Sequence, residues 1–187
     1  MRKSQLYILI FTLLMVILTS CGKGDNAQST SIADLAVIYS TLEEITDDSE
    51  LVVEVTMTGE FEQIPEYEGA NFKLTDAEVN EVIKGDESYN GGNIKIFEFA
   101  ASNITKKNDK FVLFLHKYEG PVTSEEAFVI SGLYQGKFRI DDKGKINYDA
   151  AKNNGEVTFQ DELSNKSLVE FKTSIKEKMK KSSGYLN

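Results

Sequence analysis

The stretch Leu51-Val52-Val53-Glu54-Val55-Thr56-Met57-Thr58 decides the fold of this chain. Its odd-numbered residues are all apolar, whereas three of its four even-numbered residues are polar. A period of two is typical of a β-strand that buries one face and exposes the other. The sequence therefore predicts a strand from residue 51 and a body whose core is built on a sheet.

Further strand patterns follow along the chain. Phe111-Val112-Leu113-Phe114-Leu115 is a continuous apolar run, which predicts a central strand covered on both faces. Turn signals rich in Gly, Asn and Asp separate the remaining candidates. Shorter strands are expected over residues 93–99, 127–134, 137–140, 145–148 and 156–159.

The segment between the first and third strands is less regular. Residues 71–84 are expected to form a strand, but the apolar positions change parity between Leu74 and Val79. A β-bulge produces such a change, and a helical turn over residues 75–82 is the alternative. Residues 61–69 are acidic and include Pro65, and we expect a loop there.

Helical spacing occurs near both ends of the chain. Apolar residues at intervals of three and four predict a short helix over residues 32–46 and a C-terminal amphipathic helix over 164–181, with Ser164 as its N-cap. The second helix is rich in lysine on its polar side and either packs on the body or lies on a membrane surface; packing is favoured. The predicted fold class is therefore mainly β (α+β), a small β-barrel or sandwich with two flanking helices.

Composition narrows the range of functions. The 187 residues include one Cys, one His and no Trp, and the formal net charge is −9. A single Cys excludes an intrachain disulfide framework, and a single His excludes a multi-histidine metal cage. The acidic balance argues against nucleic acid as a partner. We predict no cofactor and no metal site.

The first residues have the organisation of a signal peptide. Arg2 and Lys3 precede an apolar run over residues 6–18, which is too short for a stable membrane span. The run ends in Leu18-Thr19-Ser20-Cys21, which resembles the bacterial lipobox. This resemblance implies that residues 1–20 are removed and that Cys21 is lipidated. Two acyl chains on Cys21 would give stable anchoring.

The lipobox also predicts the organisation of the mature chain. Residues 21–31 are small and polar and are expected to form a lipidated flexible tether. Residues 32–187 are expected to form a single β-barrel-like domain that includes the C-terminal helix. The expected location is the outer face of the bacterial cytoplasmic membrane, or the outer membrane if the source is Gram-negative.

Four segments carry a second family resemblance: residues 48–55, 79–85, 94–96 and 110–115. Their order and spacing are similar to bacterial extracytoplasmic domains with a TIMP-like OB barrel. The resemblance implies a small OB-like β-barrel over the body of the chain. It does not extend to inhibition of metalloproteases, since that activity needs a free N-terminal Cys, and Cys21 is expected to be acylated.

Each candidate site residue also has an ordinary structural explanation. His116 is the one side chain that could act as a general base near neutral pH, but no Gly-x-Ser-x-Gly motif accompanies it, and a structural role at a strand end is favoured. Tyrosines at or near strand ends either line a groove or form an ordinary rim; they are Tyr118, Tyr134 and Tyr148. Most carboxylates are expected to be solvated surface groups; they are Asp47, Asp48, Glu50, Glu60, Glu62, Glu66, Glu68, Glu125, Glu126, Asp141 and Asp142.

Two functions remain open. The favoured one is a non-catalytic binding or assembly module, anchored to the membrane through lipid on Cys21, with a protein or envelope component as partner. The alternative is an envelope hydrolase that uses paired carboxylates or His116.

Overall fold

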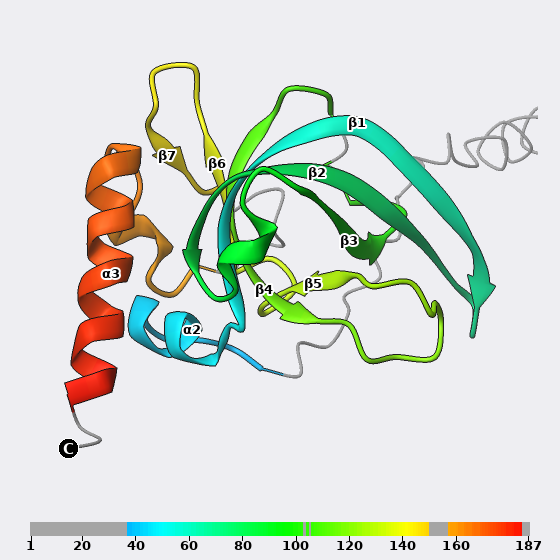
Figure 1. Ribbon diagram of the computed structural model, residues 1–187, viewed down its shortest axis with the longest axis horizontal. Helices are drawn as coiled ribbons and strands as arrows, with labels where there is room; N and C mark the ends of the chain where they lie inside the picture. The colour runs from blue at the N-terminus through cyan, green and yellow to red at the C-terminus, as the bar shows by residue number, and fades with distance from the viewer. Residues whose placement is uncertain (1–36, 103, 105, 150–156, 185–187) are drawn as a thin grey trace, which may run out of the picture. The chain divides into compact units, whose positions relative to one another are not determined.

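A computed structural model describes residues 37–102, 104, 106–149 and 157–184 of the chain (Figure 1). The expected signal peptide, Cys21 and the tether lie outside these residues. Seven strands and two α-helices make up most of the described part: β1 Leu51–Tyr67, β2 Ala70–Lys84, β3 Asn93–Phe99, β4 Lys110–Lys117, β5 Phe128–Ile130, β6 Lys137–Ile140, β7 Ile146–Asn147, α2 Leu42–Asp48 and α3 Leu168–Gly184. Two short 3-10 turns, η1 Glu87–Tyr89 and η3 Gln160–Glu162, complete the order. The prediction of a mainly β fold with two helices is confirmed.

The sheet closes on itself through five of its strands. Strand β1 pairs with both β2 and β4, and the order β1-β2-β3-β5-β4 returns to β1. All pairings in this ring are antiparallel except that of β3 with β5, which is parallel and consists of one residue pair, Ile96 and Phe128. Strands β6 and β7 extend the sheet from the edge of β4 (Figure 1).

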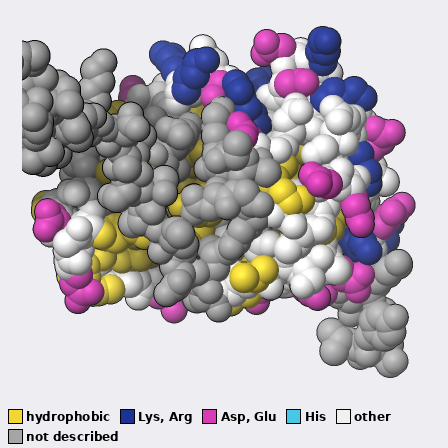
Figure 2. All heavy atoms as spheres, turned by 180° about the vertical axis from the view of Figure 1, so that it is seen from behind, with side chains coloured by type: hydrophobic (Ala, Val, Ile, Leu, Met, Phe, Trp, Pro, Cys, Tyr) yellow, Lys and Arg dark blue, Asp and Glu magenta, His cyan; other side chains and the backbone are white. Residues whose placement is uncertain are grey.

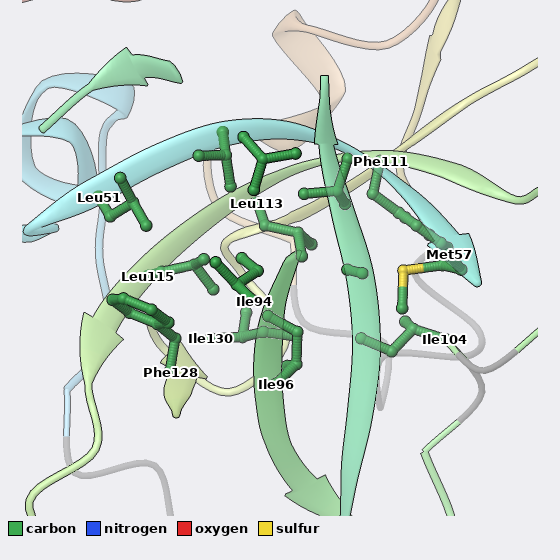
Figure 3. Close-up of a cluster of buried hydrophobic side chains, with 14 of the residues drawn as sticks. Leu51, Met57, Ile94, Ile96, Ile104, Phe111, Leu113, Leu115, Phe128 and Ile130 are labelled. Carbon is green, nitrogen blue, oxygen red and sulfur yellow. The ribbon is translucent and has the colours of Figure 1, made fainter. Parts of the chain in front are cut away.

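Strand β4 separates two hydrophobic clusters, as expected from its continuous apolar run. Leu113 and Leu115 face the interior of the ring, where they meet Ile96 and Phe128 (Figure 3). Phe114 faces the other way, toward a cluster that includes both helices. The prediction that this strand is covered on both faces is confirmed.

Strands β1 and β2 form a long hairpin whose far part was not foreseen. The expected loop over residues 61–69 is wrong: β1 continues through Pro65 to Tyr67 and turns at Glu68-Gly69, where φ is 51° and 81°. These positive angles suit the two-residue type I′ turn of a hairpin. Strand β1 pairs with β4 only as far as Thr56, so its far part has no described strand on that edge, and a proline is tolerated there.

Strand β2 contains a β-bulge, but it lies after Val79 and not between Leu74 and Val79, where it was expected. Glu54 pairs with Glu81 and Val55 with Val79, so Asn80 is the extra residue of a bulge. The alternative of a helical turn over 75–82 is wrong, since β2 is continuous. The bulge does not explain the parity change between Leu74 and Val79: these two residues point to opposite sides of the sheet and belong to different hydrophobic clusters. A second irregularity sets Thr58, Gly59 and Glu60 opposite Asp76. Beyond it lies a segment that we call the arm, residues 61–75, at the end of the molecule opposite α3 (Figure 1).

Of the expected N-terminal helix over 32–46, residues 32–36 lie outside the described residues, and the described helix begins and ends later than expected. Helix α2 begins at Leu42 behind the N-cap Thr41, whose hydroxyl accepts a hydrogen bond from the Glu44 N–H at 3.1 Å. The residues directly before α2 were expected to be helical, but residues 37–40 have no helical structure, and Ile38, expected on the apolar stripe, is 56% exposed. The side chain of Gln135 binds the backbone of Tyr39 and so competes with helix formation there.

The C-terminal helix starts later than the expected residue 164 and, as α3, runs from Leu168 to Gly184. Its N-cap is Ser167, which forms a capping box with Glu170, whereas the Ser164 hydroxyl donates to the Gln160 carbonyl. The apolar stripe of α3 packs on the body: Phe171 and Ile175 are fully buried. None of the described helices is both long and apolar enough to cross a membrane.

Three expected strands are shorter or missing in the described residues. Strand β7 covers only Ile146–Asn147 of the expected 145–148. Strand β5 covers only Phe128–Ile130 of the expected 127–134, since a turn through Gly132 and Leu133 follows it. Of the expected strand 156–159, residues 157–159 are described, and they do not pair with the sheet but lead into η3.

Candidate functional site

His116 lies at the end of β4, between two carboxylates. Its Nε2 is 3.1 Å from Asp48 Oδ2, and its Nδ1 is 3.8 Å from Glu50 Oε1. Asp48 is the last residue of α2, and Glu50 precedes β1. The fold therefore brings His116 together with two of the acidic residues that the sequence singled out.

The carbonyls at the end of α2 are held by Lys84, which fixes the position of Asp48. The Lys84 ammonium donates hydrogen bonds to the carbonyls of Thr46 at 2.6 Å, Asp47 at 2.9 Å and Ser49 at 2.7 Å. The last carbonyls of a helix lack partners within the helix, and here the Lys84 ammonium, from the end of β2, supplies the missing hydrogen bonds.

Tyr39 completes this group from the segment before α2. Its buried hydroxyl donates to Asp48 Oδ2 and lies 3.4 Å from His116 Nε2. Burial, together with the hydrogen bond to the Asp48 carboxylate, raises the pKa of the Tyr39 phenol far above its usual range. The phenol is therefore a permanent donor that orients Asp48.

A hydrolytic triad needs a nucleophile next to His116. The hydroxyl of Ser49, which lies between Asp48 and Glu50 in the sequence, points away from His116. Ser49 is buried, donates to the Ile45 carbonyl at 2.7 Å and lies 2.8 Å from the Ser131 hydroxyl. Among the described residues, His116 makes its polar contacts with Tyr39, Asp48 and Glu50. This geometry suits a polar link between the N-terminal segment and the sheet.

Two further candidate carboxylates have structural partners elsewhere on the surface. Asp141 caps the turn between β6 and β7, and the backbone N–H of Lys145 lowers its pKa. Glu126 pairs with Lys117 at 3.0 Å and accepts from the Tyr89 hydroxyl. Within the described ranges, no group of three or more His, Cys, Asp or Glu residues could hold a metal ion.

A second candidate site lies on the outer side of β1, β2 and β3 along the arm. Cross-strand register places Phe72 beside Phe99 and Ile64, and Leu74 beside Phe97. Partners in register point to the same side of a sheet. The Phe72 ring centroid is 4.9 Å from that of Phe97 and 5.1 Å from that of Phe99.

The connection between β4 and β5 folds back over these rings. Tyr118 stacks on Phe97 with ring centroids 4.2 Å apart, and its hydroxyl accepts a hydrogen bond from the Val122 N–H at 3.1 Å. Tyr67 pairs with Ala70 and so shares the side of Phe72; it is 38% exposed. We call this surface the aromatic face: Tyr67, Phe72, Phe97, Phe99, Tyr118 and Val122.

Acidic groups surround the aromatic face. Lys95 lies 3.0 Å from Glu125, 3.9 Å from Glu62 and 4.0 Å from Asp76, so three carboxylates face one ammonium group. The hydrogen bond to Glu125 raises the pKa of Lys95. Exposed carboxylates continue along the arm and the β4–β5 connection; they are Glu66, Glu68 and Glu119. Figure 2 shows hydrophobic side chains gathered at this end of the molecule, with acidic side chains at their border.

Sequence reasoning considered Tyr118 but missed Phe72, Phe97 and Phe99 as members of one surface. The missing information was the register of the arm, because residues 61–69 were expected to be a loop. The parity of Phe97 and Phe99 was a usable signal, since both lie opposite in parity to the buried Ile94 and Ile96. Of the other two tyrosines, Tyr148 packs against the helical cluster and Tyr134 lies beneath the Lys137 ammonium.

Searches of the sequence against models of known families and against curated proteins return no match.

Proposed function

We propose that the chain is a lipid-anchored, extracytoplasmic binding or assembly module of a bacterial envelope, without catalytic activity. Cys21 carries the lipid, residues 21–31 form the tether, and the body stands at the outer face of the membrane. The observation that supports binding is the aromatic face. Its rings are only partly buried, and contiguous apolar surface bordered by polar groups is typical of interaction sites.

We also propose that the five-stranded ring is an OB-like barrel. Its strand order and its single parallel contact between β3 and β5 support this assignment. In such a barrel the outer face of the second and third strands is a common ligand site. The aromatic face occupies the corresponding position on β2 and β3, which links the proposed fold with the proposed function.

In-cell photo-crosslinking tests the binding function. A photoreactive phenylalanine analogue would replace Tyr67, which is exposed on the aromatic face, and in a control it would replace Asp142, which is exposed in the β6–β7 turn. We expect a reproducible crosslinked partner from position 67 and not from position 142. A pattern from position 67 that is no stronger than that from position 142 would remove the proposed function.

The lipid anchor has its own test. Metabolic labelling with an alkyne fatty acid should tag the wild-type protein and should leave Cys21→Ser untagged and released from the membrane fraction. Labelling of Cys21→Ser at the wild-type level would contradict lipidation of Cys21.

An envelope hydrolase remains the second candidate, because His116 contacts Asp48 and Glu50. A histidine oriented by a carboxylate can act as a general base. The test is hydrolysis of a panel of ester, amide and glycosidic substrates by the wild-type protein and by His116→Ala. Activity that His116→Ala abolishes would support the hydrolase, and inactivity of the wild-type protein on every substrate would remove it.

A further inference from the structure

We propose that the aromatic face binds a basic, apolar segment of a partner protein. This inference rests on the proposed binding function and adds the chemistry of the partner. The face offers two kinds of contact: aromatic and aliphatic side chains in its centre, and carboxylates around them. A partner that satisfies both presents apolar side chains flanked by lysine or arginine.

The centre of the face supplies apolar contact on a rigid support. Phe72, Phe97 and Tyr118 form a continuous ring stack across β2, β3 and the β4–β5 connection. Ile64, Leu74 and Ala127 are buried beneath it. The stack is therefore held in place before any partner arrives, which lowers the entropic cost of binding. Tyr67 stands beside it with more than a third of its surface exposed.

The border of the face determines the charge of the partner. Lys95 is already engaged by Glu125, Glu62 and Asp76, and the side chains of Glu62 and Glu125 are 63% and 46% exposed. The surplus carboxylates can therefore accept hydrogen bonds from cations of a partner. Aromatic side chains add to the attraction, because Lys and Arg are also favoured over ring faces. Opposite charges across an interface raise the association rate and fix orientation.

Two other modes of binding fit this surface less well. Beyond Thr56, one edge of β1 has no described strand beside it. Addition of a partner strand there is disfavoured by Pro65, which has no N–H, and by the glutamates on both sides of it. Anionic polymers and anionic lipid surfaces would meet like charge at the border. The partner segment is therefore expected to bind through side chains.

A labelled peptide tests this chemistry on the purified full-length chain. The probe is a fluorescent peptide of repeated Lys-Phe-Lys-Leu units, and its counterpart carries Glu in place of Lys. Fluorescence anisotropy measures the affinity of each peptide at low and at physiological ionic strength. We expect the basic peptide to bind more tightly than its acidic counterpart and to lose affinity as salt rises.

Charge-reversal variants locate the binding. Glu62→Lys combined with Glu125→Lys should lower the affinity of the basic peptide about tenfold or more. The matched control combines Asp142→Lys with Glu177→Lys, which are exposed and lie on other elements, and should change the affinity less than about twofold. Tyr67→Ser should weaken binding of the basic peptide at every salt concentration, since it removes apolar contact. Equal effects of the two charge-reversal pairs, or a preference for the acidic peptide, would overturn the inference.

The crosslink from position 67 separates failure of this inference from failure of the proposed function. A crosslinked protein segment rich in Lys or Arg supports the inference. A crosslink to a glycan, to lipid or to an acidic segment overturns the inference and leaves the binding function in place. Absence of any specific crosslink at position 67 overturns both.

Discussion

The side-chain amide of Gln135 forms hydrogen bonds with both backbone polar groups of Tyr39, the N–H and the carbonyl. Gln135 Oε1 accepts a hydrogen bond from the Tyr39 N–H at 2.8 Å, and Gln135 Nε2 donates to the Tyr39 carbonyl at 2.9 Å. Gln135 is fully buried, and Thr158 also donates to the Tyr39 carbonyl, at 2.7 Å. The segment before α2 is therefore attached to the sheet at one residue by three hydrogen bonds.

Gln135→Leu should destabilise the protein because it leaves the buried Tyr39 N–H without its acceptor. A buried unsatisfied donor costs about 1–3 kcal/mol of the free energy of unfolding. Urea denaturation measures this loss, and hydrogen exchange should show reduced protection of the Tyr39 amide. Thr158→Val is the matched control: the Tyr39 carbonyl keeps Gln135, so the loss should be smaller. A loss for Thr158→Val equal to that for Gln135→Leu would contradict the double attachment.

Ionisation of Tyr39 should make the protein sensitive to alkaline pH. The folded state raises the pKa of Tyr39 by burial and by its contact with Asp48, whereas the phenol of the unfolded chain ionises near about pH 10. The unfolded chain therefore releases this proton first. The contribution of Tyr39 to the free energy of unfolding is complete below about pH 10 and falls as pH rises above it.

The variant Tyr39→Phe isolates this effect, because Phe has no proton to release. The difference in free energy of unfolding between wild type and Tyr39→Phe should shift in favour of the variant between about pH 9 and about pH 11. Urea denaturation across this range gives the difference, and tyrosinate absorbance follows ionisation. A difference that stays constant with pH would contradict the burial of Tyr39 against Asp48.

Lys172 of α3 should control acid stability through its contacts with β1 and β2. Its ammonium pairs with Glu54 and, at 2.6 Å, with Glu81; the Lys172 and Glu54 side chains are only 15% and 14% exposed. Lys172→Met leaves Glu54 without its cation, which should cost about 3 kcal/mol at neutral pH. Lys176→Met, at a more exposed pair with Glu81, should cost less than about 1 kcal/mol.

The stability difference between wild type and Lys172→Met should depend on pH. The hydrogen bond from Lys172 lowers the pKa of Glu81, so the folded state favours the ionised carboxylate. The stability that comes from this carboxylate is present above the pKa of the unfolded chain, about 4.3, and is lost as pH falls further. The advantage of wild type over Lys172→Met should therefore shrink in acid. An advantage that grows as pH falls would be inconsistent with the pairing.

Phe171 should be the residue of α3 on which the packing of the helix most depends. Its ring is fully buried, with its centroid 4.9 Å from that of Phe138 and 6.3 Å from that of Phe114. Phe171→Ala should lower the free energy of unfolding by about 3–5 kcal/mol. Val169, on the same helix but 73% exposed, is the control: Val169→Ala should change it by less than about 0.5 kcal/mol. Similar losses for both variants would contradict the orientation of α3.

The parts of the fold that the sequence predicted well are those with their own periodic signal. Strand β1 alternates from Leu51, and β4 is a continuous apolar run, so both carry their burial in their residue types. The arm has no such signal, because Glu62, Gln63 and Pro65 line a part of β1 that is exposed. Its strand structure depends on pairing with β2 and on the β4–β5 connection, which are tertiary features.

The candidate sites were predictable to different extents. The acidic residues around Asp48 and the single His116 stood out in the sequence. Their contact with one another depends on the pairing of β1 with β4, which places Leu51 opposite Leu115. The aromatic face depends on register across three strands and on the fold-back of Tyr118. Neither arrangement follows from spacing along the chain.

The pairing of β3 with β5, which closes the ring of five strands, has a consequence for the order of folding. The β1–β2 hairpin closes through a two-residue turn and is expected to form early, whereas the pairing of Ile96 with Phe128 needs distant segments. Until β5 arrives, β3 and β4 each keep an unpaired edge, and such edges promote aggregation. A chain that stalls before residue 128 should therefore associate with other copies, and the three residues of β5 cover the facing edges of β3 and β4.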